Sequence, residues 1–357
     1  MLIKSLSIQN FRNHAATSVE LCDGVNVFVG KNAQGKTNLL EAIYMTCVGR
    51  GFRSNKDKDA IMFGKDFARV KTVAMKRYGK VDVDIIVAQG KQIKINSIPI
   101  SKMGELMGTM TCVFFNPDEL KLVKEAPADR RRFMDIDLSQ MDKTYFYNLL
   151  KYNKILKQRN ALLKSMNIAS ADELRSLDIW DEELCKAGEL IISRRRIFCE
   201  ELNKSVGAVH KAIAPDEVVE IELETVQNCS TWNNFLGELR KSRDKDLRLR
   251  TTTVGPHRDD IAISINGKDV RGFASQGQQR TAALSMKIAE LGVFEKATGE
   301  KPVLLLDDVF SELDEGRRVR LLELIGGWQT VITATEFDEA LCPGVKLYQV
   351  HNGAVTC

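Results

Sequence analysis

Residues 30–37 have the types and spacing of a phosphate-binding loop. They read Gly-Lys-Asn-Ala-Gln-Gly-Lys-Thr, which fits the P-loop pattern G-x-x-x-x-G-K-[ST]. In such a loop, backbone N–H groups close around phosphate and the next helix adds positive potential from its N-terminus. Lys36 is expected to reach the β- and γ-phosphates of ATP, and the Thr37 hydroxyl to hold Mg²⁺. The residues expected to surround the nucleotide are Gly30, Lys31, Asn32, Ala33, Gln34, Gly35, Lys36, Thr37 and Asn38.

The segments on both sides of this loop favour a P-loop over a glycine turn that matches by chance. A P-loop follows a strand and opens a helix. Val25–Val29 alternates in the manner of a strand, and Leu39, Leu40 and Ile43 recur at helical spacing. The sequence therefore predicts the strand, loop and helix order that this chemistry needs.

A second segment, far along the chain, supplies two acids. Pro302–Asp308 is an apolar run that ends in Asp307 and Asp308, a Walker B pattern. Asp307 is expected to hold Mg²⁺, and Asp308 to act as the general base or water-positioning group. The alternative is a core strand that ends in two solvated acids, which is common in α/β folds. Two carboxylates beside phosphate repel each other unless a cation is present, and this favours the metal site.

A third segment, Phe273–Thr281, opens a predicted helix with small and polar residues. Ser275, Gly277 and Gln278 would offer a second phosphate-facing surface at that helix N-terminus. One chain rarely needs two such surfaces for one nucleotide, so the economical interpretation is that this loop contacts ATP held by another subunit. The alternative is an ordinary capped helix with Ser275 as the N-cap.

The order of these motifs resembles the ABC-type ATPase heads of the SMC class, with Ser311–Asp314 in the place of a D-loop. The details are similar to the RecF family of bacterial recombinational repair. The resemblance implies an α/β fold, an ABC-type P-loop ATPase head of mixed sheets and flanking helices with an inserted helical arm. It also makes Arg12 a candidate nucleotide contact. The segments that carry it are Ile8–Asn13, Gly49–Arg53, Phe115–Leu120, Pro127 with Arg131–Phe133, and Gly255–Asp260.

Some positions depart from the wider ATPase pattern. The signature loop reads Ser-Gln-Gly-Gln-Gln, and Walker B ends in Asp308 where many relatives have glutamate. No glutamine stands near Asn116–Glu119, the expected Q-loop, and Thr333–Thr335 occupies the expected switch-histidine position. These departures leave the γ-phosphate sensors unassigned and indicate slow hydrolysis, which suits a switch better than a motor.

Composition is typical of a cytoplasmic protein without a membrane span. Hydrophobic residues make up 44% and charged residues 28% of the 357 residues, enough for a sizeable core. No apolar run approaches the roughly 20 residues of a transmembrane helix. The eight cysteines lack paired metal-ligand spacing and are expected to be reduced thiols. The net charge of +4 permits nucleic-acid binding without requiring it.

The pattern of hydrophobic residues divides the chain into an ATPase head, residues 1–125 and 246–357, and an inserted arm, residues 126–245. Val81–Val87 and Lys91–Asn96 are predicted to be antiparallel strands joined at Gly90. Residues 126–245 are predicted to be helical, with apolar stripes over 138–162 and 180–209 and a break at Asn167–Ser176. The two stripes predict a helical hairpin arm.

DNA binding is implied by the resemblance more than by charge. The basic clusters Arg130–Arg132, Arg194–Arg196 and Arg50–Lys58 could be solvated faces or DNA contacts. The RecF resemblance implies duplex DNA and gapped DNA junctions as ligands, RecR and RecO as partners, and RecA loading as the outcome. It also implies an ATP-dependent homodimer that binds two nucleotides between its subunits.

The resulting hypothesis is an ATP-dependent DNA-binding switch with weak, DNA-stimulated ATPase activity, acting in recombinational repair and replication restart. Its alternatives are an ABC-type ATPase subunit of a transporter, a structural DNA-bridging protein with vestigial turnover, and a nuclease of the overcoming-lysogenisation type. The chain after Thr333 is too short for the nuclease domain of that last class.

Overall fold

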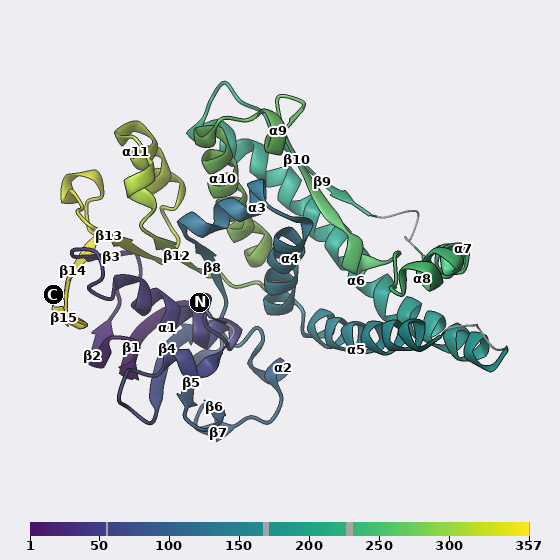
Figure 1. Cartoon of the computed structure of the whole chain (residues 1–357). Coiled ribbons are helices and arrows are strands. Elements are labelled where there is room, and N and C mark those ends of the chain that lie inside the picture. The colour runs from purple at the N-terminus through teal and green to yellow at the C-terminus, as the bar shows by residue number, and fades with distance from the viewer. Residues whose placement is uncertain (55, 167–170, 226–230, 357) are drawn as a thin grey trace.

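The computed structural model describes residues 1–54, 56–166, 171–225 and 231–356 (Figure 1). Its central sheet has the strand order β15-β14-β3-β13-β12-β8. The strands are β15 (Ala354–Thr356), β14 (Lys346–His351), β3 (Val25–Val29), β13 (Thr330–Ala334), β12 (Val303–Asp307) and β8 (Cys112–Phe115). The P-loop follows β3 and the Walker B acids end β12, so both motifs share one sheet, as predicted.

The central sheet is covered on both faces, which explains its continuous apolar strands. All five residues of β12 and of β13 are buried. Alternate residues of a strand point to opposite faces. Leu304 and Leu306 pack with the helix α10 (Gln276–Thr298), and Val303 and Leu305 pack with α1 (Lys36–Val48). The two helices that begin at the phosphate-binding motifs are therefore held on opposite sides of the same strands.

A second, antiparallel sheet packs against the other side of α1. Its order is β2-β1-β4-β5-β6-β7. The predicted pair at Gly90 is confirmed as β5 and β6. The strands are β1 (Leu2–Phe11), β2 (His14–Glu20), β4 (Ala68–Lys76), β5 (Gly79–Val87), β6 (Lys91–Ile95) and β7 (Ile98–Pro99). The short segments η1 (Asp57–Ala60) and α2 (Met103–Leu106) also belong to this part of the chain, whereas η2 (Pro117–Leu120) and α3 (Lys121–Lys124) follow β8 and contact α10.

The arm projects from this head as a pair of long helices (Figure 1). The helices α5 (Lys143–Ser165) and α6 (Ala171–Ile213) run antiparallel, since Asp142 pairs with Arg194 and Lys151 pairs with Glu183. The first predicted stripe is divided at Asp142, which follows the last residue of α4 (Pro127–Met141) and whose carboxylate caps α5. The predicted break at 167–176 is wrong from Ala171 onward, where α6 has begun, and residues 167–170 lie outside the described part.

The expectation that 126–245 is wholly helical is also wrong. Residues Val219–Glu224 form β9, which pairs with β10 (Asp260–Ile265), and β10 pairs with β11 (Lys268–Asp269). The alternation of Val219, Ile221 and Leu223 with glutamates is a strand pattern that the preceding long helix obscured. The helices α7 (Trp232–Lys241) and α8 (Arg243–Leu249) follow β9. The division into head and arm domains at 126 and 245 stays a prediction.

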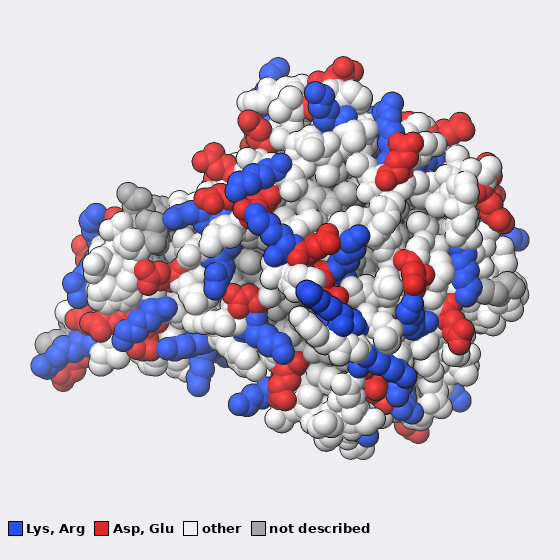
Figure 2. Space-filling view, turned by 180° about the vertical axis from the view of Figure 1, so that it is seen from behind, with Lys and Arg blue, Asp and Glu red and all other residues white. Residues whose placement is uncertain are grey.

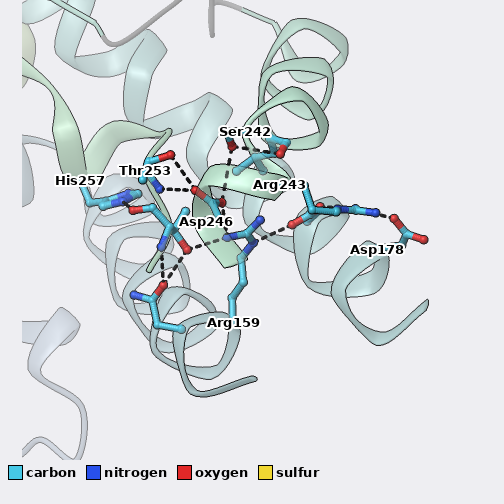
Figure 3. A network of polar contacts seen from close by, with 11 residues as sticks. Arg159, Asp178, Ser242, Arg243, Asp246, Thr253 and His257 are labelled. Atoms are coloured by element: carbon cyan, nitrogen blue, oxygen red, sulfur yellow. Dashed lines mark hydrogen bonds and ion pairs between the residues drawn. The ribbon is translucent and has the colours of Figure 1, made fainter. Parts of the chain in front are cut away.

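Buried arginines hold the arm together (Figure 3). Arg159 of α5 is fully buried and donates to Asp181 at 2.6 Å and to Asp246 at 2.8 Å. Arg243 bridges Asp178 and Asp181. The network joins α5, α6 and α8, so these charges are structural.

The segment Gly255–Asp260 is tied to α4 and α6 by the same means. Asp260 accepts two hydrogen bonds from the buried Arg130, and Asp259 accepts one at 3.0 Å from the buried Arg195. Most arginines in two of the clusters, 130–132 and 194–196, therefore make contacts within the protein. The sequence had offered these clusters as solvated faces or DNA contacts. The segment continues through η3 (Pro256–Arg258), and among the remaining elements are α9 (Val270–Phe273), η4 (Val309–Glu312), α11 (Glu315–Leu324) and η5 (Glu339–Leu341).

No helix in the described ranges is long and apolar enough to cross a membrane.

Candidate nucleotide-binding site

The two motif glycines of the P-loop are both required by close packing. A Cβ on Gly30 would lie 2.4 Å from the carbonyl oxygen of Val350, and one on Gly35 would lie 2.5 Å from Asn13 Oδ1. Gly35 also has a φ of +108°, in the region that favours glycine. Between them, Lys31, Asn32 and Ala33 are exposed, so the loop presents its backbone to solvent.

Lys36 lies inside this loop and faces the Walker B acids. Its Nζ donates to the carbonyl oxygens of Gly30 at 2.5 Å and Lys31 at 3.0 Å. Burial lowers the pKa of this ammonium, and the carboxylates of Asp308 and Asp307 oppose that shift. A phosphate placed in the loop would replace carbonyl partners by a charged one, which gives stronger hydrogen bonds.

The P-loop and Walker B residues meet directly. The Thr37 hydroxyl donates to Asp307 Oδ1 at 2.8 Å, although 270 positions separate them. Burial raises the pKa of Asp307, and hydrogen bonds from Thr333 and Thr37 oppose that rise. A hydroxyl and a carboxylate side by side are hard oxygen donors of the kind that Mg²⁺ prefers. These residues fit the ion that the sequence predicted.

Thr333, which the sequence placed only at the expected switch-histidine position, contacts both Walker B residues. Its hydroxyl donates to Asp307 Oδ1 at 2.7 Å and accepts from the backbone N–H of Asp308 at 3.0 Å. Asp308 itself has a φ of 50°, rare for a residue with a side chain. Thr333 is the register partner of Asp307 on the neighbouring strands β13 and β12. Only the register of these strands brings the two side chains together, and the sequence alone does not give that register.

Both ends of the chain hold the P-loop in place. His14, at the start of β2, lies within hydrogen-bonding distance of the carbonyl oxygens of Gly35 (3.0 Å) and Gly353 (2.7 Å). The backbone N–H of Gly353 donates to the carbonyl of Gln34, and that of Asn352 donates to the Gln34 side chain. The side chain of Gln34 is thus occupied by the turn between β14 and β15. His14 was not singled out from the sequence, because its partners are distant backbone atoms.

Arg12 and Asn38 are engaged with neighbouring side chains. Arg12 makes two hydrogen bonds to the buried carboxylate of Glu41, at 2.8 and 2.9 Å. Asn38 donates to Asn13 and accepts from Arg53 at 2.8 Å. The positive charge of Arg53 also opposes the rise that burial causes in the pKa of Asp307. With its hydrogen bond to Asn38, this places Arg53 at the edge of the candidate site and not only in a basic surface cluster. Nucleotide contacts by Arg12 and Asn38 stay predictions.

The signature loop has the geometry of a helix cap. The Ser275 hydroxyl accepts from the backbone N–H of Gln278, and the Gln278 side chain accepts from the backbone N–H of Ser275. Ser275 remains exposed at the surface, and the neighbouring Phe273 is 75% exposed. Figure 1 shows the start of α10 well apart from the start of α1. Within one subunit, the signature loop and the P-loop do not meet.

At the expected Q-loop position, Asn116 caps a short helix and lines a cavity. Asn116 caps η2 by accepting from the backbone N–H of Glu119. Together with Arg53 and Lys287, it lines a polar cavity of about 380 Å³. In the D-loop segment, Ser311 donates to the carbonyl of Asp308, which fixes the turn after Walker B.

Known proteins are similar to this chain in both sequence and fold. The family model described as the RecF/RecN/SMC N terminal domain matches residues 2–350. A protein of Clostridium perfringens strain 13, called DNA replication and repair protein RecF, is 44% identical over 366 residues, with 100% of each chain covered. A protein of the same name from Lachnospira eligens is 41% identical, with 99% of each covered.

Two solved structures are also similar to this chain in fold. The recombination mediator protein RecF-ATP in the RecFOR pathway has a TM-score of 0.89 and 37% identity, and covers 99% of this chain and 97% of its own. An SMC head bound to the C-winged helix domain of ScpA has a TM-score of 0.60 at 15% identity, covering 100% and 96% respectively, and supports the fold alone.

Proposed function

This chain belongs to the RecF family of DNA replication and repair proteins, and from that premise we propose that it is an ATP-dependent switch on duplex DNA. ATP would bind Gly30–Thr37 of one subunit and the loop Ser275–Gln278 of a second subunit. Two nucleotides would then close a homodimer around a composite DNA surface, and slow hydrolysis would release it.

The observation that carries this proposal is the contact between Thr37 and Asp307. It brings the P-loop and Walker B into one site with Lys36 between the loop carbonyls and the two acids. Thr37 and Asp307 would hold Mg²⁺, which would supply neutralising charge to the phosphate oxygens. This chain's own part is to bind phosphate through the loop and Lys36, and to orient water through Asp308.

The exposed, capped start of α10 supports a contact in trans. Ser275 satisfies the N–H of Gln278 within its own helix, while other N–H groups of the first turn remain available to an anion. The loop is exposed and lies apart from its own P-loop, so a phosphate that meets both must lie between two subunits.

The setting proposed for this switch is recombinational repair in the cytoplasm. Solved relatives are described within the RecFOR pathway. By that relationship we propose RecR and RecO as partners, gapped duplex DNA as the ligand, and help with RecA loading as the result. The transporter and nuclease alternatives lose support because the chain aligns over its whole length with RecF relatives.

Sedimentation with ATP, ADP and no nucleotide tests the subunit sandwich. Ser275→Arg should leave ATP binding to the single subunit nearly intact and prevent ATP-driven dimerisation. If Ser275 served only as a cap, the variant would lose roughly 1 kcal/mol of stability and still dimerise. A melting curve distinguishes the two outcomes, and a normal dimer would refute the sandwich.

A further inference from the structure

The helix α5 has an unusual charge composition for an exposed helix. Its 23 residues include five lysines and one arginine but no aspartate or glutamate. The arginine, Arg159, is buried in the ion-pair network of the arm. All five lysines are exposed: Lys143, Lys151, Lys154, Lys157 and Lys164.

Three exposed lysines on the other arm helices are paired with glutamates. Lys186 pairs with Glu183 and Lys204 pairs with Glu201 on α6, and Lys241 pairs with Glu238 on α7. Each of these pairs is spaced three residues apart, where helix side chains are neighbours. On α5 the residues at that spacing are other lysines, because Lys151, Lys154 and Lys157 follow one another at steps of three. Like charges at that spacing destabilise a helix, so the fold does not explain them.

Four of the lysines share one side of α5. Lys143, Lys154, Lys157 and Lys164 are separated by 11, 3 and 7 residues, all close to whole turns of an α-helix. We call these four residues the lysine stripe. Lys151 lies to one side and pairs with Glu183 at 3.1 Å. Within the described ranges, Lys154, Lys157 and Lys164 have no ion-pair partner.

The helix α5, which carries the stripe, lies at an outer edge of the molecule. Figure 2, in which the arm projects to the left, shows several blue side chains along its lower edge, the edge that α5 forms in Figure 1. Tyr147 and Leu150 lie on the same side and are 43% and 52% exposed. From Lys143 to Lys164 the helix rises about 30 Å, comparable to one turn of duplex DNA at roughly 34 Å.

We propose that the lysine stripe of α5 is a surface for the phosphate backbone of duplex DNA. The inference rests on the proposed function and names the surface that would carry it. Lysine ammonium groups on flexible side chains suit contacts that do not depend on the DNA sequence. Contacts to phosphate fix the position of a protein on DNA without distinguishing bases. An acidic protein partner is the alternative ligand of this surface. The salt dependence of DNA binding distinguishes the two ligands, because it changes on removal of the lysines only if they contact DNA.

The test compares two triple variants of the full-length protein with equal changes in net charge. Lys154→Gln, Lys157→Gln and Lys164→Gln remove most of the stripe. Lys186→Gln, Lys204→Gln and Lys241→Gln remove three exposed lysines from the neighbouring helices. Binding of a fluorescent duplex about one to three turns long is measured with ATP over a salt series, beside melting curves and ATP affinity as checks on folding.

The stripe variant should bind duplex DNA more weakly by roughly an order of magnitude at physiological salt, with a log–log salt slope shallower by about 0.9 for each phosphate contact removed. The control variant should keep the wild-type slope. An unchanged slope in the stripe variant, or an equal change in both variants, overturns the proposal while the wild-type protein still binds DNA. Absence of duplex binding by the wild-type protein would overturn the DNA-binding function as well.

Discussion

At the scale of residues, the site depends on a few oxygen atoms placed by distant segments. The meeting of Lys36, Thr37 and Asp307 in one place was predictable, because the motif spacing identifies them and the strand pattern places both motifs at one sheet edge, while their roles toward the nucleotide stay predictions. Thr333 and His14 were not predictable, since each acts on atoms that only the strand register and the chain termini bring close.

Lys36 is the first test at this scale. Lys36→Met removes the point charge among the phosphates and should abolish or greatly weaken ATP binding. Lys36→Arg should bind yet hydrolyse poorly, because a planar fork replaces a compact ammonium. Titration with a fluorescent ATP analogue measures both variants. Equal ATP affinity in the wild-type and Lys36→Met proteins would contradict the P-loop assignment.

Thr333 is expected to position both Walker B acids. Thr333→Val keeps the shape and removes a hydroxyl that joins Asp307 to Asp308. Hydrogen bonds to charged groups contribute about 1.5–3 kcal/mol, so turnover should fall roughly 10- to 100-fold. The Mg²⁺ concentration needed for tight ATP binding should rise, while Thr333→Ser should restore both. A Thr333→Val protein with unchanged Mg²⁺ dependence would show that the hydroxyl serves the fold only.

At the scale of elements, buried ion pairs join α4 and α6 to the segment Gly255–Asp260. The sequence showed arginine clusters but not their partners, because Asp259 and Asp260 lie more than sixty residues from Arg195 and Arg130. It also missed β9, where a strand follows a 43-residue helix within a range of helical composition. Charge alone therefore misassigned residues whose partners come from another element.

The arm network predicts a large effect from one substitution. Arg159→Met would leave Asp181 and Asp246 buried without their shared cation. Breaking such a pair costs about 3–5 kcal/mol. Urea unfolding should show this loss, while ATP affinity changes little because the site lies in the head. Stability within about 0.5 kcal/mol of wild type, the ordinary range for surface changes, would contradict a structural role.

His257 predicts how arm stability depends on pH. Burial lowers the pKa of this histidine to about 4, and its ring contacts Tyr152 at 2.6 Å and the Thr252 carbonyl at 3.0 Å. Between pH 6.5 and about 4, His257 is protonated in the unfolded chain but neutral in the folded chain. The free energy of unfolding therefore falls as the pH falls. The loss is at most about 1.4 kcal/mol per pH unit. His257→Gln should lose less stability than wild type over that window in parallel unfolding curves, and identical pH profiles would contradict this.

At the scale of the whole molecule, the P-loop and the signature loop are held on opposite faces of one sheet by α1 and α10. The sequence predicted the shared sheet and the projecting arm, since both follow from periodicity and motif order. The sequence could not give the proposed surface for DNA, because unpaired and paired lysines cannot be distinguished until their neighbours are placed. In the proposed cycle, ATP binding closes two subunits on DNA and hydrolysis releases it.

The most direct test of that cycle is the release of duplex DNA by Asp308→Asn in ATP. The substitution keeps shape and removes the charge proposed to orient water, so ATP binding and dimerisation should persist. Turnover should fall by roughly 10²–10⁴-fold, the scale for loss of a general base. The account predicts that this variant stays on duplex DNA far longer than wild type. Release at the wild-type rate would contradict it, because ATP would then act as a structural ligand whose hydrolysis controls nothing.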